Sequence, residues 1–187
     1  MRILLILLIS VSSILSVEVG KVEDYRGRVD LLKKDHLKGV LLSKSGISLE
    51  VGDILRTKRN GYALVSFIDR SKVELFEFTR LKILGYREVN LQRGIVKFEV
   101  ESLKDIKGFK VRTPHVLIGV KGTVFWVYVF PGFTRIVVQE GDVEKVYKFS
   151  IREKSWEQVG IQPEVFIREE PFSEKPPFEA FLEVRLQ

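Results

Sequence analysis

The sequence predicts an all-β fold, either an antiparallel-rich sandwich or a solenoid-like β domain of many short strands. Turn-forming residues recur at intervals of about 8–12 residues, which is the spacing typical of sheets made of short strands. Residues 95–101 alternate apolar and polar side chains, as expected for a sheet with one face in water. No segment sustains the apolar period of a helix. The turn spacing alone would also allow a barrel.

The composition suits one domain with a small appendage. The chain has 187 residues, of which 45% are hydrophobic, enough for a sizeable core. Its 13 Phe and 5 Tyr favour half-buried pleated sheets. There is no cysteine, which excludes disulfides, thiolate catalysis and cysteine-ligated metals.

The first segment, residues 1–16, is predicted to be a secretory signal peptide. Arg2 supplies the positive charge, an apolar run follows, and Ser13 or Ser16 supplies the small residue before a cleavage point. The run is shorter than the roughly 20 residues of a membrane span, although an uncleaved anchor remains an alternative. We therefore expect an exported protein, periplasmic or otherwise extracytoplasmic, with the β domain over residues 17–170.

The net charge of +6 comes from cations and anions that are interspersed along the chain. Nucleic-acid binding needs a concentrated basic patch, so no nucleic-acid partner is expected. A mild positive excess fits attraction to an envelope protein, a cell-wall polymer or an anionic lipid surface.

The N-terminal half is predicted to alternate strands with tight turns, after a lead-in at residues 17–24. Asn60-Gly61 is a strong hairpin dipeptide, and Asp69-Arg70-Ser71 is a turn of residues that bond their own backbone. The expected strands are residues 27–34, 37–43, 54–57, 62–68 and 72–78, with the alternation continuing through Leu81 and Ile83.

The C-terminal half is predicted to centre on residues 123–130, which are apolar on both faces. Turns are expected at Arg93-Gly94, Lys121-Gly122 and Pro131-Gly132, and a charged loop at residues 152–157. The expected strands are residues 95–101, 109–113, 116–120, 123–130, 134–139, 143–150 and 165–167.

The last segment, residues 171–187, is predicted to be a Pro-rich connection and a terminal strand. Pro171, Pro176 and Pro177 exclude a helix or a central strand there. Residues 178–186 alternate apolar and charged side chains, so they form either an edge strand that docks back or a strand offered to a partner.

Five short segments follow one another in a characteristic order. They are VGDILRT at residues 51–57, GYA with FIDRS within residues 61–71, LQRG with Val96 and Phe98 within residues 91–98, TP with GVKGT within residues 113–123, and a V–EGDV pattern at residues 137–143. Their order resembles the FecR-like domain, a bacterial extracytoplasmic β-rich module, over residues 46–143. Arg70 stands where that family usually has Gly, and Lys121 replaces its usual Arg.

The resemblance implies a non-enzymatic binding domain of the cell envelope, in extracytoplasmic sensing or signalling. Well-known members of the family resemble a three-part design of a cytoplasmic anti-sigma segment, one membrane span and an exported domain. No such segment precedes the predicted signal peptide, so a free-standing exported domain is expected. The alternative is a structural or glycan- and peptidoglycan-associated envelope protein.

The candidate partner contacts are Arg112, Lys121 and Trp156. Arg112 and Lys121 are expected to be exposed beside the turns of the TP and GVKGT motifs, although these motifs would also serve simply to shape tight connections. Trp156, in the predicted charged loop, is the candidate for stacking on a sugar, whereas Trp126 is expected in the core.

No catalytic, cofactor or metal residue is assigned. The only histidines, His36 and His115, are far apart in the sequence, and His115 is expected in a turn or at the surface. Carboxylates such as Asp53 and Asp69 could form the pair of a glycan hydrolase or lyase, but acids at turns usually bond their own backbone.

Overall fold

The structure is a computed structural model that describes residues 17–104, 108–150, 155–159 and 164–168. The described residues form strands and turns without a helix, so they contain no helix that could cross a membrane. The strands are β1 (Glu18–Arg26), β2 (Val29–Leu32), β3 (Val40–Leu41), β4 (Ile47–Glu50), β5 (Ile54–Thr57), β6 (Tyr62–Phe67), β7 (Lys72–Leu75), β8 (Arg80–Gly85), β9 (Glu88–Glu99), β10 (Phe109–Arg112), β11 (Val116–Phe130), β12 (Phe133–Ser150), β13 (Ser155–Val159) and β14 (Glu164–Arg168).

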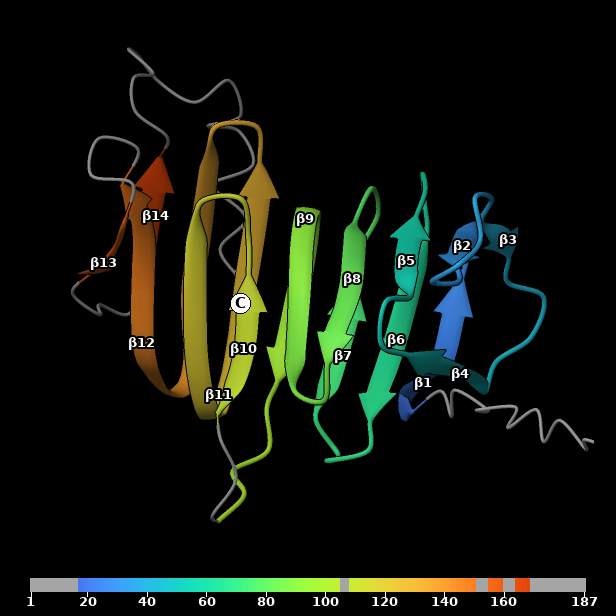
Figure 1. Cartoon of the computed structure of the whole chain (residues 1–187), viewed down its shortest axis with the longest axis horizontal. Coiled ribbons are helices and arrows are strands. Elements are labelled where there is room, and N and C mark those ends of the chain that lie inside the picture. Colours follow the sequence, from blue (N-terminus) through green and yellow to red (C-terminus); the bar gives the residue numbers. More distant parts are fainter. Residues whose placement is uncertain (1–16, 105–107, 151–154, 160–163, 169–187) are drawn as a thin grey trace, which may run out of the picture.

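These strands form one 14-stranded sheet that folds over into two layers (Figure 1). The first layer contains β4, β1, β6 and β7, then the later part of β9, the later part of β11, the earlier part of β12, and β14. The second layer contains β3, β2, β5 and β8, then the earlier parts of β9 and β11 on either side of β10, the later part of β12, and β13. Nearly all pairs are antiparallel, and only β9–β10 is parallel.

Three long strands, β9, β11 and β12, pass from one layer to the other at glycines with positive φ. Gly94 (φ 100°) lies at the corner of β9, Gly122 (φ 62°) at that of β11, and Gly141 (φ 78°) at that of β12. A Cβ at Gly94 would lie 2.3 Å from the Thr79 Oγ1, and one at Gly141 would lie 2.3 Å from the Gly122 carbonyl oxygen. Both the backbone conformation and the close packing therefore require glycine at these corners.

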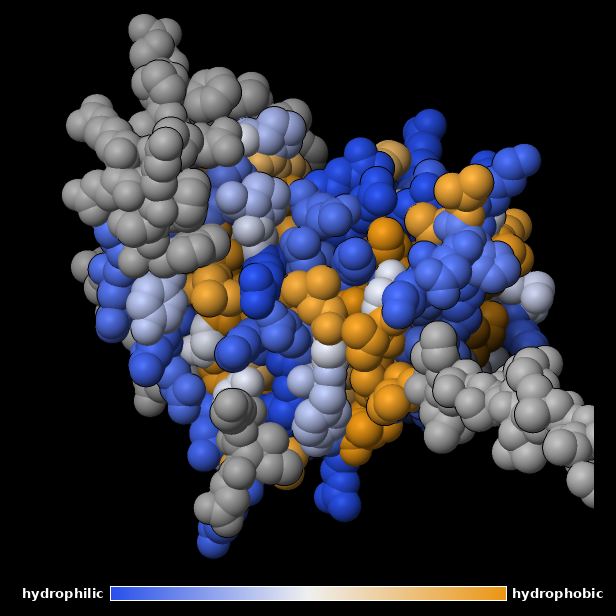
Figure 2. Space-filling view, viewed as in Figure 1, coloured by the Kyte–Doolittle hydropathy of each residue, from blue (hydrophilic) through white to orange (hydrophobic). Residues whose placement is uncertain are grey.

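The core lies between the layers. Inward side chains alternate with outward ones along each strand, so β6 buries Ala63, Val65 and Phe67 completely or nearly so. The rings of Phe67 in the first layer and Phe109 in the second are 5.3 Å apart, centroid to centroid, and join the layers. On the face seen in Figure 2, hydrophilic and hydrophobic side chains are interspersed over the strands.

The all-β, antiparallel-rich prediction is confirmed, with a two-layered sheet as its form. Several local predictions were wrong. Residues 18–24 of the predicted lead-in belong to strand β1, and residues 37–43 contain only the two-residue β3. The predicted turns at residues 93–94 and 121–122 are corners within continuous strands. The predicted loop 152–157 overlaps strand β13. The predicted signal peptide and the segment 171–187 lie outside the described residues.

The backbone geometry predicts different costs of substitution for Gly46, in the turn before β4, and for Gly94, at the β9 corner. Gly46→Ala should destabilise the fold by about 1–2 kcal/mol, because φ is 78° but no atom lies within 4 Å of the added Cβ. Gly94→Ala should cost roughly 1–3 kcal/mol more, because its Cβ also overlaps Thr79. Urea unfolding of both variants measures the difference. Equal losses would show that the β9 corner relaxes freely.

Candidate functional site

The acid of the FIDRS motif, Asp69, joins two turns and the segment after β9. It is buried, and its carboxylate accepts hydrogen bonds from the Ser71 amide (3.0 Å) and the Ser71 hydroxyl (2.8 Å). It also forms a 2.6 Å ion pair with the Arg87 guanidinium, whose side chain is only 3% exposed. Arg87 donates a further bond to the Glu101 carbonyl (3.0 Å), and the Glu101 amide donates to the Ser71 Oγ (3.1 Å). The motif acid is therefore a structural anchor, and Arg87, which the sequence did not single out, is its partner.

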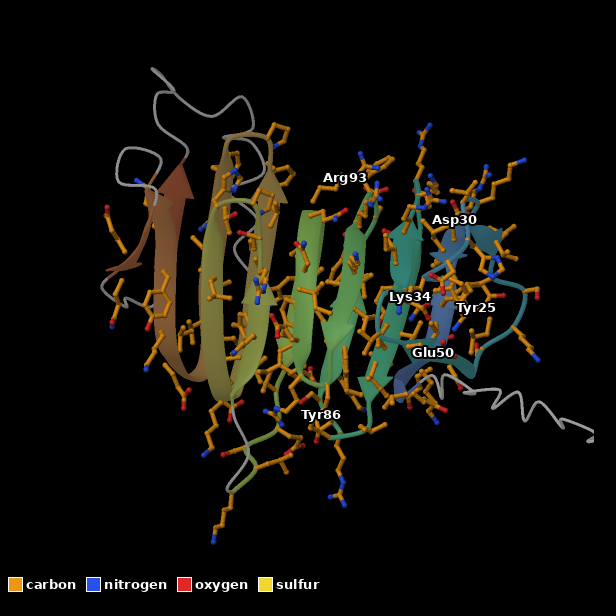
Figure 3. The ribbon with its side chains drawn as sticks, in the orientation of Figure 1. Tyr25, Asp30, Lys34, Glu50, Tyr86 and Arg93 are labelled. Carbon is orange, nitrogen blue, oxygen red and sulfur yellow. The ribbon has the colours of Figure 1, made fainter. Side chains whose placement is uncertain are left out.

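The other motif acid, Asp53, anchors the end of the sheet at which β2 and β4 meet. It is fully buried and accepts hydrogen bonds from the Glu50 amide (3.0 Å) and the Lys34 amide (3.2 Å). The Lys33 ammonium completes the site at 2.9 Å. Lys34 and Glu50 lie at this end of the molecule (Figure 3). Asp53 and Asp69 thus hold separate networks and share no hydrogen bond among the described residues.

Thr57 of the VGDILRT motif and Thr79, at the start of β8, hold the opposite ends of the strands. The Thr79 amide donates to the Thr57 Oγ1 (2.9 Å), and the Thr79 hydroxyl donates to the Ile95 carbonyl (3.0 Å). These bonds satisfy backbone groups where β5, β7, β8 and β9 turn between layers. The polar residues of the motifs therefore shape the corners of the sheet.

The TP motif forms a similar buried cluster in the turn between β10 and β11. His115 lies in this turn, which was one of its two expected positions, but it is not at the surface. His115 is 6% exposed, and its Nδ1 lies 2.7 Å from the Thr134 Oγ1. The Thr113 Oγ1 accepts from the Val116 amide (3.0 Å). His36 is exposed, and no group of three metal-ligating side chains occurs among the described residues.

The three candidate partner contacts lie apart in the second layer. Arg112, near the end of β10, pairs in register with Leu117 at the start of β11, and its Nε lies 2.6 Å from the Glu88 carboxylate. Lys121 is half-buried at the other end of that part of β11. Trp156 lies on β13, in register with Phe149 of β12. The structure thus spreads these residues over three strands.

A different set of side chains gathers on the outward face of the first layer, and we call it the aromatic face. It consists of Tyr62, Phe76, Trp126 and Tyr128, all half-buried. Ring centroids are 5.9 Å apart for Tyr62 and Phe76, and 5.1 Å apart for the stacked pair of Phe76 and Trp126. Trp126 and Tyr128, two residues apart on β11, are 6.2 Å apart. Trp126 was expected in the core, but its inward neighbours Phe125 and Val127 fill that role.

Charged groups border the aromatic face. Arg26 lies over the Tyr62 ring at 5.1 Å and Arg135 over the Tyr128 ring at 5.9 Å. The Lys97 ammonium lies between Glu74 and Glu99, and its hydrogen bond to Glu99 is the main reason that its pKa is raised. Burial raises the pKa of Tyr62 to about 12, and the hydrogen bond from its hydroxyl to Glu74 adds to this effect. The aromatic face therefore offers flat aromatic rings bordered by charged side chains of both signs.

The Asp69–Arg87 pair should contribute far more to stability than an exposed pair. Arg87→Ala should cost about 3–5 kcal/mol, because it leaves a buried carboxylate unpaired. Arg112→Ala, which removes an arginine that is 53% exposed, should cost about 0–1 kcal/mol. Chemical denaturation measures both losses, and a double-mutant cycle with Asp69→Ala isolates the pair. Similar losses for Arg87→Ala and Arg112→Ala would contradict the anchoring role.

The raised pKa of Tyr62 predicts an alkaline loss of stability. Below pH 10 the phenol is neutral in both states, so its full contribution is present. Between pH 10 and about 12 the unfolded state ionises while the folded state stays protonated, so stability falls. Unfolding curves across this range should therefore fall more steeply for the wild type than for Tyr62→Phe. Parallel pH profiles would show that Tyr62 titrates normally.

Comparison with known proteins identifies the matched part of the chain. Residues 53–144 match the family model described as FecR protein, a stretch that begins at buried Asp53 and contains both Asp69 and Arg87. A search among curated proteins finds no match. The FecR family is regulatory and takes part in extracytoplasmic sensing and signalling at the cell envelope. The fold, the motif contacts and the family match agree over this stretch, and the chain is a FecR-like domain protein whose FecR domain covers residues 53–144.

Proposed function

We propose that this protein is an exported, non-enzymatic binding domain of the cell envelope that acts in extracytoplasmic sensing or signalling. The regulatory character of the FecR family supports the general role. The observation that carries the binding role is the aromatic face on the first layer. Its partner is an envelope protein.

The chemistry of the aromatic face suits protein recognition. Binding energy in protein interfaces concentrates on Trp, Tyr and Arg side chains that lie near the centre of the contact. Tyr62, Phe76 and Trp126 offer large rings whose positions are fixed by an edge-to-face and a stacked contact, so little side-chain entropy is lost on binding. The ion pairs of Lys97 with Glu74 and Glu99 add polar groups of both signs beside the rings.

A second candidate function is that of a glycan- or peptidoglycan-associated envelope protein. The stacked rings of Phe76 and Trp126 favour it, because flat aromatic faces also suit the apolar faces of sugar rings. Arg112, Lys121 and Trp156 remain proposed contacts in either case, at separate places on the second layer.

A binding assay with matched variants tests the proposal. The full chain is immobilised and exposed to solubilised envelope proteins and, separately, to purified peptidoglycan. Trp126→Ala should reduce retention of a specific envelope protein at least about tenfold, as expected for a hot-spot residue. Phe78→Ala removes an aromatic residue that is 54% exposed outside the face, so it should leave retention unchanged.

Three results would decide against the leading role. Retention that survives Trp126→Ala would exclude the aromatic face, provided that circular dichroism shows the variant to be folded. Retention on peptidoglycan alone, lost in Trp126→Ala, would favour the glycan-associated function. If Lys121→Glu abolishes binding while Trp126→Ala leaves it unchanged, the partner contacts the second layer and not the aromatic face.

A further inference from the structure

We propose that residues 34–46 form a docking surface for an anionic lipid bilayer, at the end of the sandwich that carries β2, β3 and β4. The inference goes beyond the proposed function, because it concerns how the domain is oriented at a membrane and not which partner it binds. We call this segment the end loop.

The end loop exposes large apolar side chains to an unusual degree. Leu37 is fully exposed (102%), Val40 is 67% exposed and Leu41 is 53% exposed. Exposed apolar residues that occur singly are normal, but three within five positions form a patch. Apolar and hydrophilic side chains lie next to one another at this end of the molecule, on the right of Figure 2. Burial in a membrane interface would remove these side chains from water.

The charges of the end loop complement an anionic surface. Lys34, Lys38 and Lys44 are all exposed, and Asp35 is the one acid of residues 34–46, so the segment carries three positive charges and one negative charge. No ion pair involves these three lysines within the described residues. Lysines beside exposed apolar side chains are the pattern of an interfacial membrane segment.

The acids nearest to the end loop are already paired. Asp53 and Glu50 share Lys33, at 2.9 Å and 3.7 Å, and Asp30 pairs with both Arg56 (3.3 Å) and Lys58 (3.6 Å). Their negative charges are therefore compensated within the fold, and the positive field of the end loop is not cancelled by them. Asp30 and Lys34 lie at the same end of the sheet (Figure 3).

The connectivity places the end loop beside β1, the first strand of the sheet. The run at residues 3–15 precedes β1 directly in the sequence, and β1 pairs with β4, the strand that follows the end loop. The Gly46 amide donates to the Val22 carbonyl (2.7 Å), which fixes the loop against β1.

Site-specific fluorescence in the full chain tests the proposal. The chain has no cysteine, so Leu37→Cys and Phe78→Cys each allow one environment-sensitive dye to be attached. Phe78 is the matched control, because it is apolar and 54% exposed but sits at the β7–β8 corner beside Glu77. Vesicles of phosphatidylglycerol and phosphatidylcholine are compared with phosphatidylcholine alone. This comparison holds whether or not residues 1–16 attach the chain to the vesicle.

The expected result is a blue shift of the emission at position 37 on anionic vesicles, with no shift at position 78. The shift should be lost when Lys34, Lys38 and Lys44 are all replaced by Gln, because each lysine near an anionic surface strengthens binding roughly fivefold.

Other outcomes would overturn the proposal. No shift at position 37, or an equal shift at position 78, would exclude a lipid contact of the end loop. An equal shift on phosphatidylcholine alone would exclude recognition of anionic headgroups. A concentration-dependent shift without vesicles would assign the patch to contacts between copies of the chain. None of these outcomes bears on partner binding through Trp126, so the failure of one proposal leaves the other intact.

Discussion

One buried ion pair, Asp69–Arg87, holds together one edge of the two layers, and the rest of the fold depends on it. We call this edge, which comprises the β6–β7 turn, the β8–β9 turn and the segment after β9, the rim. Asp69 lies in the turn between β6 and β7, Arg87 lies in the turn between β8 and β9, and both reach the segment after β9 through Ser71 and Glu101. Two strands of the first layer and two of the second therefore end at one shared network. Removing either charge would leave the other in a low-dielectric interior without compensation, which is why the pair fixes the geometry so firmly.

The two-layered sheet follows from that rim together with the glycine corners. β9, β11 and β12 each contribute residues to both layers, so the layers cannot separate without breaking strands. The polar motif residues occupy the turns and corners, where strand pairing leaves backbone groups without partners. Chemically suggestive residues such as Asp53, Asp69 and His115 are thereby committed to the interior, and recognition falls to side chains on the outward faces.

The sequence predicted strands well wherever alternation is regular, as in β6 and in the later part of β9. It missed β1 because the register shifts between Val22 and Asp24, which breaks the two-residue period. The corners at Gly94 and Gly122 were predicted as turns, since a strand corner and a tight turn can both require a glycine with positive φ. Arg87 lies outside the five motif segments and its partner Asp69 lies 18 residues earlier, so no local pattern marks it as buried. Trp126 was misplaced since residues 123–130 are apolar on both faces, and only pairing with β9 decides which face is buried.

The central claim is that the motif residues serve the fold, and amide hydrogen exchange of the full chain tests it most directly. The amides of Ser71 and Glu101 lie outside the strands but donate to Asp69 and to the Ser71 hydroxyl within the anchored rim. They should exchange as slowly as the core strand amide of Val127, because they open only when the sheet unfolds. Exchange as fast as that of an exposed loop amide such as Lys38 would contradict the account.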